Sequence, residues 1–219
     1  MDLHFDQISS SIPYLLWGIT VTLKITLFSL VLGFALGTIL AIFKIAKYRV
    51  LRWFGIVYTS IFRGTPVLVQ LFLAYFAVPE LTGYSITAFE AAVLTFSLNG
   101  AAYISEVIRG GILAVDKGQR EAALSLGVPA RPMMFDIILP QALKNILPSL
   151  VNESITLLKN TTLVSTIGVV DIMRRAQVIQ SNTFLAFEPL IIAAIIYYVL
   201  VMILTVFAKR LERRISRSD

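Results

Sequence analysis

Long apolar runs constrain this chain more than any other feature of its sequence. The longest, from Pro13 to Ala46, contains only two charged side chains, Lys24 and Lys44. About 20 apolar residues in a helix are enough to cross the hydrocarbon core of a bilayer. Only 15% of the 219 residues are charged, whereas soluble domains average about a quarter. We therefore expect an all-α membrane protein with residues 1–219 forming a single domain, because a helix satisfies its own backbone groups in lipid.

Five runs are long and apolar enough to be read as membrane spans. They are Pro13–Ala46, Leu51–Val78 (interrupted by Arg63-Gly64-Thr65-Pro66), Ala88–Leu113, Met134–Leu158 and Leu190–Ala208. The first is longer than a bilayer requires, so we expect it to tilt or to extend beyond the membrane. The interval between the last two runs, residues 161–188, is predicted to be a re-entrant turn followed by a short helix covered by protein.

The distribution of cationic residues predicts the orientation of the chain. No Lys or Arg precedes Lys24, and none lies between Pro79 and Thr87. The positive-inside rule then places the N-terminus outside and the C-terminus in the cytoplasm. Arg174 and Arg175 run against the rule, since this topology puts them outside. The cationic residues on the predicted cytoplasmic side are Lys44, Lys47, Arg49, Arg52, Arg109, Lys117, Arg120, Arg131, Lys209, Arg210, Arg213, Arg214 and Arg217.

Several classes of protein are excluded by what the sequence lacks. There is no cysteine and a single histidine, His4, which excludes disulfides, thiolate chemistry and most zinc sites. We expect no catalytic residue and no metal site, because no nucleophile–base pair or pair of membrane aspartates is present. The net charge of +6 comes from Lys and Arg residues that cluster at the ends of the apolar runs. No nucleic-acid binding is therefore expected. Residues 1–13 have no basic segment, so no cleavable signal peptide is expected. A channel or secondary transporter usually has internal repeats, and none is visible.

The segment between the third and fourth runs has the composition of a short surface helix. Residues 121–126 are good helix formers, and Ala122, Ala123 and Ser125 among them are small. Gly127 is a natural C-terminal stop, and Pro129 and Pro132 are expected to prevent continuation. Composition alone leaves two interpretations open. The helix is either an ordinary connector or a docking element that a partner approaches closely.

The spacing within this segment resembles a known family. Glu121-Ala122-Ala123, Gly127, Ile137 and Leu139-Pro140 match the EAA loop of ABC importer permeases. Phe62 to Pro66 and Lys159 to Leu163 are similar to signatures of the polar amino acid branch. The resemblance, which includes similarity to arginine, lysine and histidine permeases, covers nearly the whole chain. It implies a multi-pass permease of the bacterial cell membrane that contacts a separate ATPase through Glu121, Ala122, Ala123, Gly127, Leu139 and Pro140.

The same resemblance implies further partners. These are a second permease, either another copy or a paralogue, and an extracytoplasmic binding protein that delivers an amino acid. The glycines of this chain are not followed by the G-x-x-x-x-G-K-[ST] pattern of a phosphate-binding loop. We therefore expect no cofactor in this chain, with ATP bound and hydrolysed by the partner ATPase.

Polar residues within the spans are the candidates for a substrate pathway. Glu153 is the most informative, because an ionisable group in a span is costly and usually functional. It shares one helical face with Ser149, Thr156 and Asn160. A second stripe contains Asn99, Tyr103 and Glu106, and Gln70 lies one turn after Pro66. These groups either bind cargo or hold helices together. The predicted substrate-binding residues are Glu153, Asn99, Gln70, Asn160, Thr161 and Thr65.

Glu153 favours a cationic cargo. The resemblance supports this, since permeases for basic amino acids look similar at Asn152-Glu153 whereas glutamine permeases tend to carry a neutral amide there. We expect a basic amino acid, with a neutral or acidic one such as glutamine or glutamate as the alternative. Arg63 either binds a substrate carboxylate or ties the structure together.

Three further residues or pairs are predicted to be structural. Glu106 is expected to pair with Arg109 or Arg120 because it lies near the cytoplasmic end of its run. Lys24 is expected to extend its ammonium group outward to the interface. Gly33 and Gly37 are expected to form a small-residue packing face.

Overall fold

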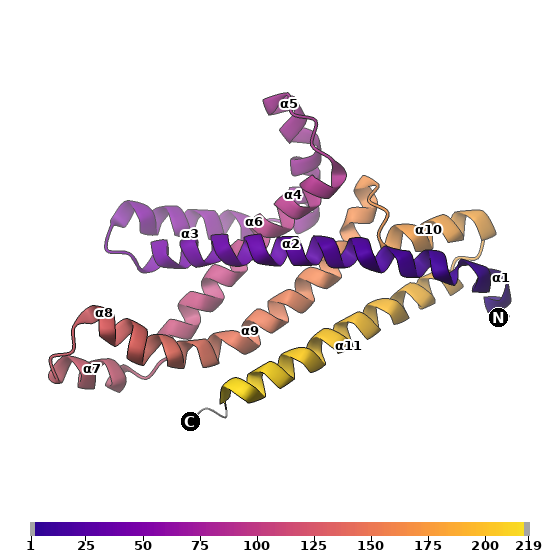
Figure 1. Ribbon diagram of the computed structural model, residues 1–219. Helices are drawn as coiled ribbons and strands as arrows, with labels where there is room; N and C mark the ends of the chain where they lie inside the picture. Colours follow the sequence, from indigo (N-terminus) through magenta and orange to yellow (C-terminus); the bar gives the residue numbers. More distant parts are fainter. Residues whose placement is uncertain (1–2, 217–219) are drawn as a thin grey trace.

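The structure is a computed structural model that describes the backbone of residues 3–216 and the side chains of residues 3–210 (Figure 1). Helices and their connections make up all of this part of the chain, which confirms the all-α prediction. Three helices are long and apolar enough to cross a membrane, and the number rises to five if each of two bent helix pairs is one span.

The helices follow one another with short connections. The first half of the chain contains α1 (Phe5–Ile8), the 3₁₀ turn η1 (Ser9–Ser11), α2 (Ile12–Ile45), α3 (Arg49–Gly64), α4 (Val67–Phe72), the π-helical η2 (Leu73–Ala77), α5 (Val78–Thr82) and α6 (Ala88–Leu113). The second half contains α7 (Lys117–Ser125), α8 (Ala130–Pro132), the π-helical η3 (Met133–Ile138), α9 (Leu139–Asn160), the 3₁₀ helix η4 (Thr161–Ile167), α10 (Ile172–Thr183) and α11 (Glu188–Ser216).

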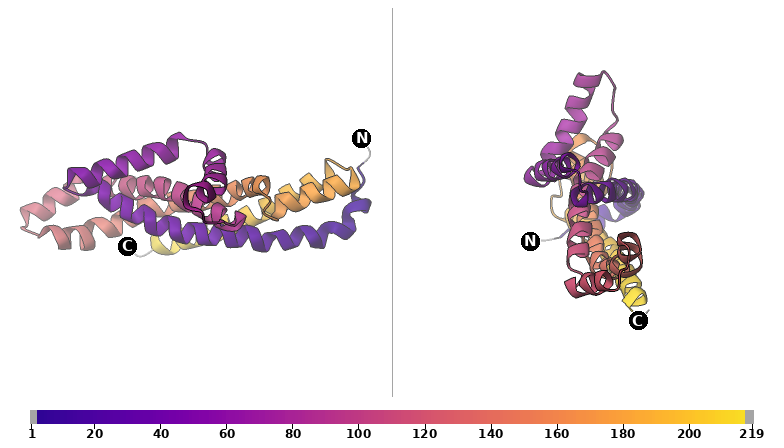
Figure 2. Two further views of the ribbon diagram at one scale, coloured as in Figure 1. Left: turned by 90° about the horizontal axis from the view of Figure 1, so that it is seen from above. Right: turned by 90° about the vertical axis from the view of Figure 1, so that its left-hand side faces the viewer.

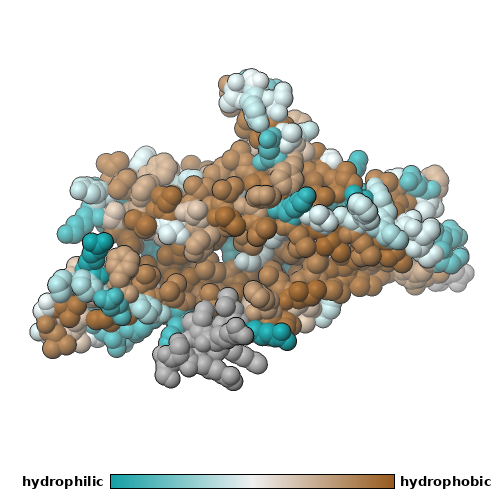
Figure 3. Space-filling model, in the orientation of Figure 1, coloured by the Kyte–Doolittle hydropathy of each residue, from teal (hydrophilic) through white to brown (hydrophobic). Residues whose placement is uncertain are grey.

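The long helices run roughly along one axis, with the short elements at the two ends (Figures 1 and 2). α7 and α8 lie at the same end as the turn between α2 and α3, and α1 and α10 lie at the other. α1 and the last turns of α11 are therefore at opposite ends, as an odd number of crossings requires. Apolar side chains cover the middle of the visible surface and hydrophilic ones gather toward its two ends (Figure 3).

Glycines allow α2 and α6 to pack closely. A Cβ atom on Gly37 would lie 2.8 Å from Ile104 Cγ2 and 3.0 Å from the carbonyl oxygen of Ala101. One on Gly33 would lie 3.3 Å from the carbonyl oxygen of Ser97. These contacts confirm the predicted packing face. The helical segment of the first span is longer than predicted and covers Phe5–Ile45, because Pro13 occupies the first turn of α2, where a missing N–H costs nothing.

The second predicted span is broken rather than straight. α3 and the α4–α5 arm meet at an angle of 103°, and Figure 1 shows the arm projecting away from the bundle. Thr65 is extended (φ −121°, ψ 146°) and Pro66 caps α4, as expected for a residue whose αR region is closed by a following proline. The predicted interruption at Pro66 is thus confirmed.

The fourth predicted span begins earlier than its sequence indicates. Pro129 ends the connection, but Pro132 lies in the first turn of the next helix, which starts at Ala130. α7 does not continue past Ser125, as expected, and Pro132 is tolerated in the next helix because the N–H groups of a first helical turn have no partner to lose. Leu139 and Pro140 also lie inside this helix rather than in a loop. The π-turn η3 precedes Pro140, as η2 precedes Pro79, and such widening relieves the clash of a proline ring with the preceding turn.

The interval before the last span has the predicted turn and short helix, here η4 and α10. They are joined at Gly168, which has a φ of +86°, and the chain bends by 47° between the helical segment Ala130–Ile167 and α10. Asp171 is fully buried; it caps α10 by accepting the N–H of Arg174 and accepts the Tyr197 hydroxyl of α11 at 3.0 Å. The guanidinium of Arg175 lies over the Tyr14 ring, 4.4 Å from its centroid. Arg175, which is an exception to the positive-inside rule, therefore lies at the end of the bundle that holds α1, opposite the end that holds α7.

Candidate functional site

α7 is a capped surface helix with a defined end. Its first turn is capped by Asp116, whose carboxylate accepts the N–H of Gly118 at 2.7 Å. At its end the N–H of Val128 donates to Ala123 O at 2.9 Å, and that of Gly127 donates to Leu124 O at 3.0 Å. This is the Schellman arrangement, and Gly127 has the positive φ of 71° that it requires. The predicted stop at Gly127 is confirmed, and the helix starts four residues before Glu121.

The residues of the EAA pattern in α7 face two ways. Ala123 is buried against Met133 and Ile138 of η3, which attaches α7 to the start of the α9 helix. Glu121, Ala122 and Ser125 are exposed. The small residues thus do not form one outward face, because Ala123 packs inward while Ala122 and Ser125 remain accessible. Leu126 is the most exposed apolar side chain here, at 82%.

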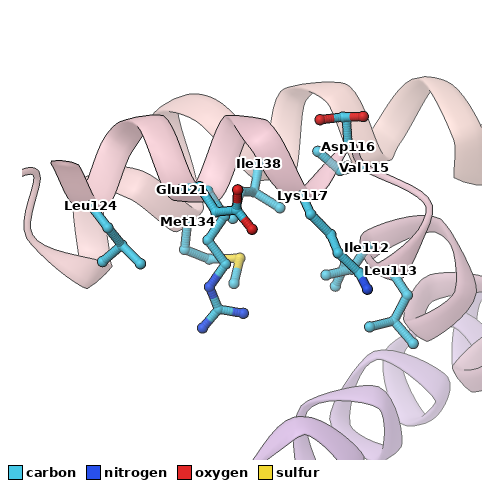
Figure 4. Close-up of a pocket in the computed structure, with 10 residues that line it drawn as sticks. Ile112, Leu113, Val115, Asp116, Lys117, Glu121, Leu124, Met134 and Ile138 are labelled. Atoms are coloured by element: carbon cyan, nitrogen blue, oxygen red, sulfur yellow. The ribbon is translucent and has the colours of Figure 1, made fainter. Parts of the chain in front are cut away.

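A pocket of about 290 Å³ lies beside α7. In Figure 4, Glu121 and Lys117 project from α7 toward it, and Leu113 from the end of α6 lies on the other side. The charged side chains of α7 form no ion pair within residues 3–210, so their charges are available to a partner. The pocket is lined by Ile112, Leu113, Val115, Asp116, Lys117, Arg120, Glu121, Leu124, Met134 and Ile138.

Three of the six predicted substrate-binding residues lie together at the break between α3 and α4. The side-chain amide of Gln70 donates to Phe62 O at 2.9 Å and to Thr65 Oγ1 at 2.8 Å. Asn99 of α6 donates to Gln70 Oε1 at 3.0 Å and to Phe62 O at 3.1 Å. The carbonyl of Phe62 has no helical N–H donor, because the residue four positions later is Pro66. The amides of Gln70 and Asn99 supply the missing hydrogen bonds. Asn99, Gln70 and Thr65 therefore hold the two halves of the broken helix against α6, which is the helix-tying role left open by the sequence.

Removing this connection should loosen the break. Asn99→Leu keeps the approximate side-chain volume but loses both hydrogen bonds, and we expect a destabilisation of about 1 kcal/mol. Thermal unfolding of the purified protein would measure it. Thr156→Val is the matched control, since the Thr156 hydroxyl bonds only to Asn152 O in its own helix. Equal unfolding temperatures for the two variants would contradict the role assigned to Asn99.

The α9 face presents a carboxylate without a partner. Glu153 is partly buried and forms no hydrogen bond or ion pair within residues 3–210. Asn160 lies two turns further along the same face and is also partly buried. Thr161 differs, since it is fully buried and donates its hydroxyl to Leu158 O at 2.7 Å. Of the predicted residues on this helix, Glu153 has the charged group still free to bind a ligand.

A charge cluster links α2, α3 and α6. Glu106 Oε1 accepts Lys44 Nζ at 2.8 Å, and Glu106 Oε2 accepts Nε and Nη2 of Arg109 at 3.0 and 2.8 Å. Lys44 also donates to Ser105 Oγ at 2.9 Å. Pairing of Glu106 with Arg109 is confirmed, and no pairing with Arg120 occurs within the described side chains.

Lys44 lies in the last turn of α2, at the predicted cytoplasmic end, but its side chain is only 2% exposed. The sequence contained a signal for this pairing. Lys44 lies inside one apolar run, and Glu106 lies at a similar depth in another. Lys24, by contrast, is exposed. It lies one turn before Phe28, whose ring contacts Phe89 at the start of α6, so its position agrees with the predicted outward placement.

Arg63 lies at the edge of this charge cluster. Its Nη1 is 3.9 Å from Glu106 Oε1, and its guanidinium lies over the ring of Tyr103 at 5.2 Å from the centroid. Arg63 of α3 thus lies against α6, over the ring of Tyr103 and near the carboxylate of Glu106.

Comparisons with known proteins agree with these features. The arginine transport system permease protein ArtQ of Bacillus subtilis (strain 168) is 50% identical over 219 residues, covering 100% of both chains. The putative glutamine transport system permease protein GlnP of Rickettsia bellii (strain RML369-C) is 48% identical over 212 residues, covering 97% of both. The crystal structure of an amino acid ABC transporter with histidines contains a chain that superposes with a TM-score of 0.93 at 41% identity, over 98% of this chain and 100% of that one.

More distant structures share the fold alone. Inward-facing MetNI methionine ABC transporter has a chain with a TM-score of 0.73 at 19% identity, over 93% of this chain and 97% of that one. The family described as "Binding-protein-dependent transport system inner membrane component" matches residues 33–217. That range contains α7, the broken α3–α4 helix and Glu153. The chain therefore belongs to the family of binding-protein-dependent transport system inner membrane components.

Proposed function

We propose that this chain is the permease subunit of an ATP-driven importer of basic amino acids. The observation that carries the cargo class is Glu153, a partly buried carboxylate with no partner among residues 3–210. A carboxylate removed from water is stable as a charge only beside a cation, and the ammonium or guanidinium group of a basic side chain supplies one. The relative named as an arginine permease supports the same class.

The proposed energy source is a separate ATPase that contacts α7. Glu121 and Ala122 are exposed, and the α7 charges form no ion pair with the side chains that the structure describes, so this surface is suited to an interface with complementary charge. Leu139 and Pro140 connect it to α9, while Ala123 and Gly127 fix its shape. A second permease, identical or paralogous, would complete the pathway, and an external binding protein would deliver the cargo. In this proposal, α7 and the C-terminus lie in the cytoplasm of a bacterial cell.

A neutral or acidic amino acid is the second candidate cargo. It is favoured by relatives of 48–50% identity that are named as putative glutamine permeases. In that case Glu153 would accept a hydrogen bond from the α-ammonium group, which all amino acids share. The two candidates therefore differ in whether Glu153 recognises the side chain or the backbone of the cargo.

Ligand binding to the purified permease–ATPase complex tests the cargo class. We expect arginine or lysine to bind at least about tenfold more tightly than glutamine, since a hydrogen bond to a charged group contributes about 1.5–3 kcal/mol. Glu153→Gln should weaken arginine binding by about tenfold or more and change glutamine binding far less. Glu80→Gln, in the exposed part of α5, is the control and should change neither. Arginine affinity retained in Glu153→Gln would overturn the proposal.

A further inference from the structure

The pocket beside α7 combines an apolar floor with a charged rim. The floor consists of Ile112, Val115, Met134 and Ile138. These side chains pack with Ala123 in a small core that joins the end of α6, α7 and η3. Leu113 and Leu124 lie at the edges of the floor and are 64% and 57% exposed. The described part of the chain therefore leaves apolar side chains of this pocket uncovered.

The charges of the rim balance one another. Asp116 and Glu121 are acidic, Lys117 and Arg120 are basic, and all four side chains are exposed. A ligand with a net charge would thus gain little from the rim as a whole. At about 290 Å³ the pocket also lies just below the volumes, from about 300 Å³ upward, that are typical of small-molecule sites. Both features favour an apolar group of about the size of one large side chain.

An apolar floor inside a polar rim is the arrangement found at the core of protein–protein interfaces. Binding energy concentrates where one side chain fills such a pocket while the rim excludes water. Here α7 forms one wall of the pocket, and its residues Lys117 and Glu121 project toward it (Figure 4). A partner that contacts α7 would therefore cover the pocket as well, so that partner is the source of the expected side chain.

Three structural elements meet at this pocket. Leu113 is the last residue of α6, Leu124 belongs to α7, and Met134 lies in η3, which continues into α9. α7 is also tied to α9 by a hydrogen bond of 3.4 Å from Gln141 Nε2 to Gln119 Oε1. A side chain inserted into the pocket would contact all three elements at once.

We propose that the pocket receives one apolar side chain of the ATPase. This inference rests on the proposed function, because it takes α7 as the contact with that ATPase. The inserted side chain holds α6 and the helix that begins at Ala130 directly, so both follow the ATPase when it moves. The flexible thioether of Met134 lets the floor adapt to the inserted group.

Obstructing the pocket should weaken the complex. Leu113→Trp enlarges a side chain at the edge of the floor, and we expect the affinity of the purified permease for the ATPase to fall about tenfold or more. Leu113→Asp, which puts a charge beside the apolar floor, is the second variant and should act in the same direction. Leu113 is exposed, so the unfolding temperature of the isolated permease should change little. Leu81→Trp, at an 84% exposed site in α5, is the control and should leave the affinity unchanged.

Salt separates insertion from contact between charges. At about 1 M salt the Debye length is about 3 Å, so contacts between exposed charges are largely screened. A complex held by an inserted apolar side chain should persist there, and Leu113→Trp should still weaken it. A complex that dissociates in high salt, or wild-type affinity in both Leu113 variants, overturns the inference.

The lack of cysteine in this chain allows the pocket to be probed directly. In Leu113→Cys the new thiol is the only one, and a maleimide should modify it readily in the isolated permease. ATPase at about ten times its Kd should slow this modification about tenfold, because only about a tenth of the sites stay free. The rate for Leu81→Cys should not change. Slow modification of Leu113→Cys before the ATPase is added would mean that another group fills the pocket, which overturns the inference.

Failure of the proposed function has a different signature. In that case the wild-type permease would neither bind the ATPase nor carry out ATP-driven uptake. If the wild type does both, but bound ATPase leaves the modification of Leu113→Cys unchanged, only the insertion into the pocket is rejected.

Discussion

Replacing Glu121 with arginine should detach the ATPase and abolish ATP-driven uptake. Glu121 is exposed, projects toward the α7 pocket and has no ion-pair partner within residues 3–210 (Figure 4). Reversing its charge places a cation where the partner surface would be complementary to an anion, and such a mismatch costs several kcal/mol at an interface. We expect co-purification with the ATPase to fall by about a hundredfold or more. Pull-down of the tagged ATPase and uptake into vesicles would measure the two effects.

Two further variants define how this result is interpreted. Gly127→Pro should have a similar effect, because proline fixes φ near −65° and cannot adopt the positive φ that ends α7. Glu80→Arg makes the same charge reversal in α5, which belongs to the arm between α3 and α6, and should leave the complex intact. If Glu121→Arg retains both the ATPase and normal uptake, α7 is not the site of contact.

Adding one methyl group at Gly18 should severely destabilise the protein. A Cβ atom there would lie 2.7 Å from both the N and Cα atoms of Ile172 and 2.9 Å from the carbonyl carbon of Asp171. These are backbone atoms at the capped start of α10, so no side-chain rotation relieves the contact. We expect Gly18→Ala to cost about 3 kcal/mol, at the upper end of the range for overpacked sites. Thermal unfolding and the yield of monodisperse protein would report it.

Gly110→Ala is the matched control for this prediction. Gly110 lies inside α6, where a Cβ atom would meet nothing within 4 Å. The same substitution should there be neutral or stabilise by up to about 1 kcal/mol, since alanine favours helix over glycine. Similar unfolding temperatures for the two variants would show that α2 and α10 can separate without cost, contrary to the packing described.

The apolar runs predicted the spans because lipid permits little besides helix. They did not predict where helices begin, since that depends on the position of each proline within its turn. Pro13 and Pro132 occupy first turns and are tolerated, whereas Pro66 separates two helices by 103°. The size of that bend is fixed by tertiary contacts from Asn99 to Phe62 and Gln70, which local sequence does not contain.

The residue types of the candidate site could be predicted from the sequence, but the contacts between those residues were harder to predict. Glu153 stands out because a carboxylate in a span is rare. The burial of Lys44 depends on its ion pair with Glu106 of α6, because the positive-inside rule gives the membrane side of a cation and not its exposure. The contacts of Arg63 with Tyr103 and Glu106 join two helices that are distant in sequence. Such contacts follow only from the packing of α3 against α6.

The continuous helix from Ala130 to Asn160, composed of α8, η3 and α9, has a mechanical consequence. At 1.5 Å per residue it is about 45 Å long, and Glu153 lies about 10 Å from its far end. A tilt of about 10° around Asn160 displaces the Ala130 end by about 8 Å and Glu153 by about 2 Å. The helix is thus a lever with a ratio of about four to one, converting a large stroke beside α7 into a small displacement of the carboxylate.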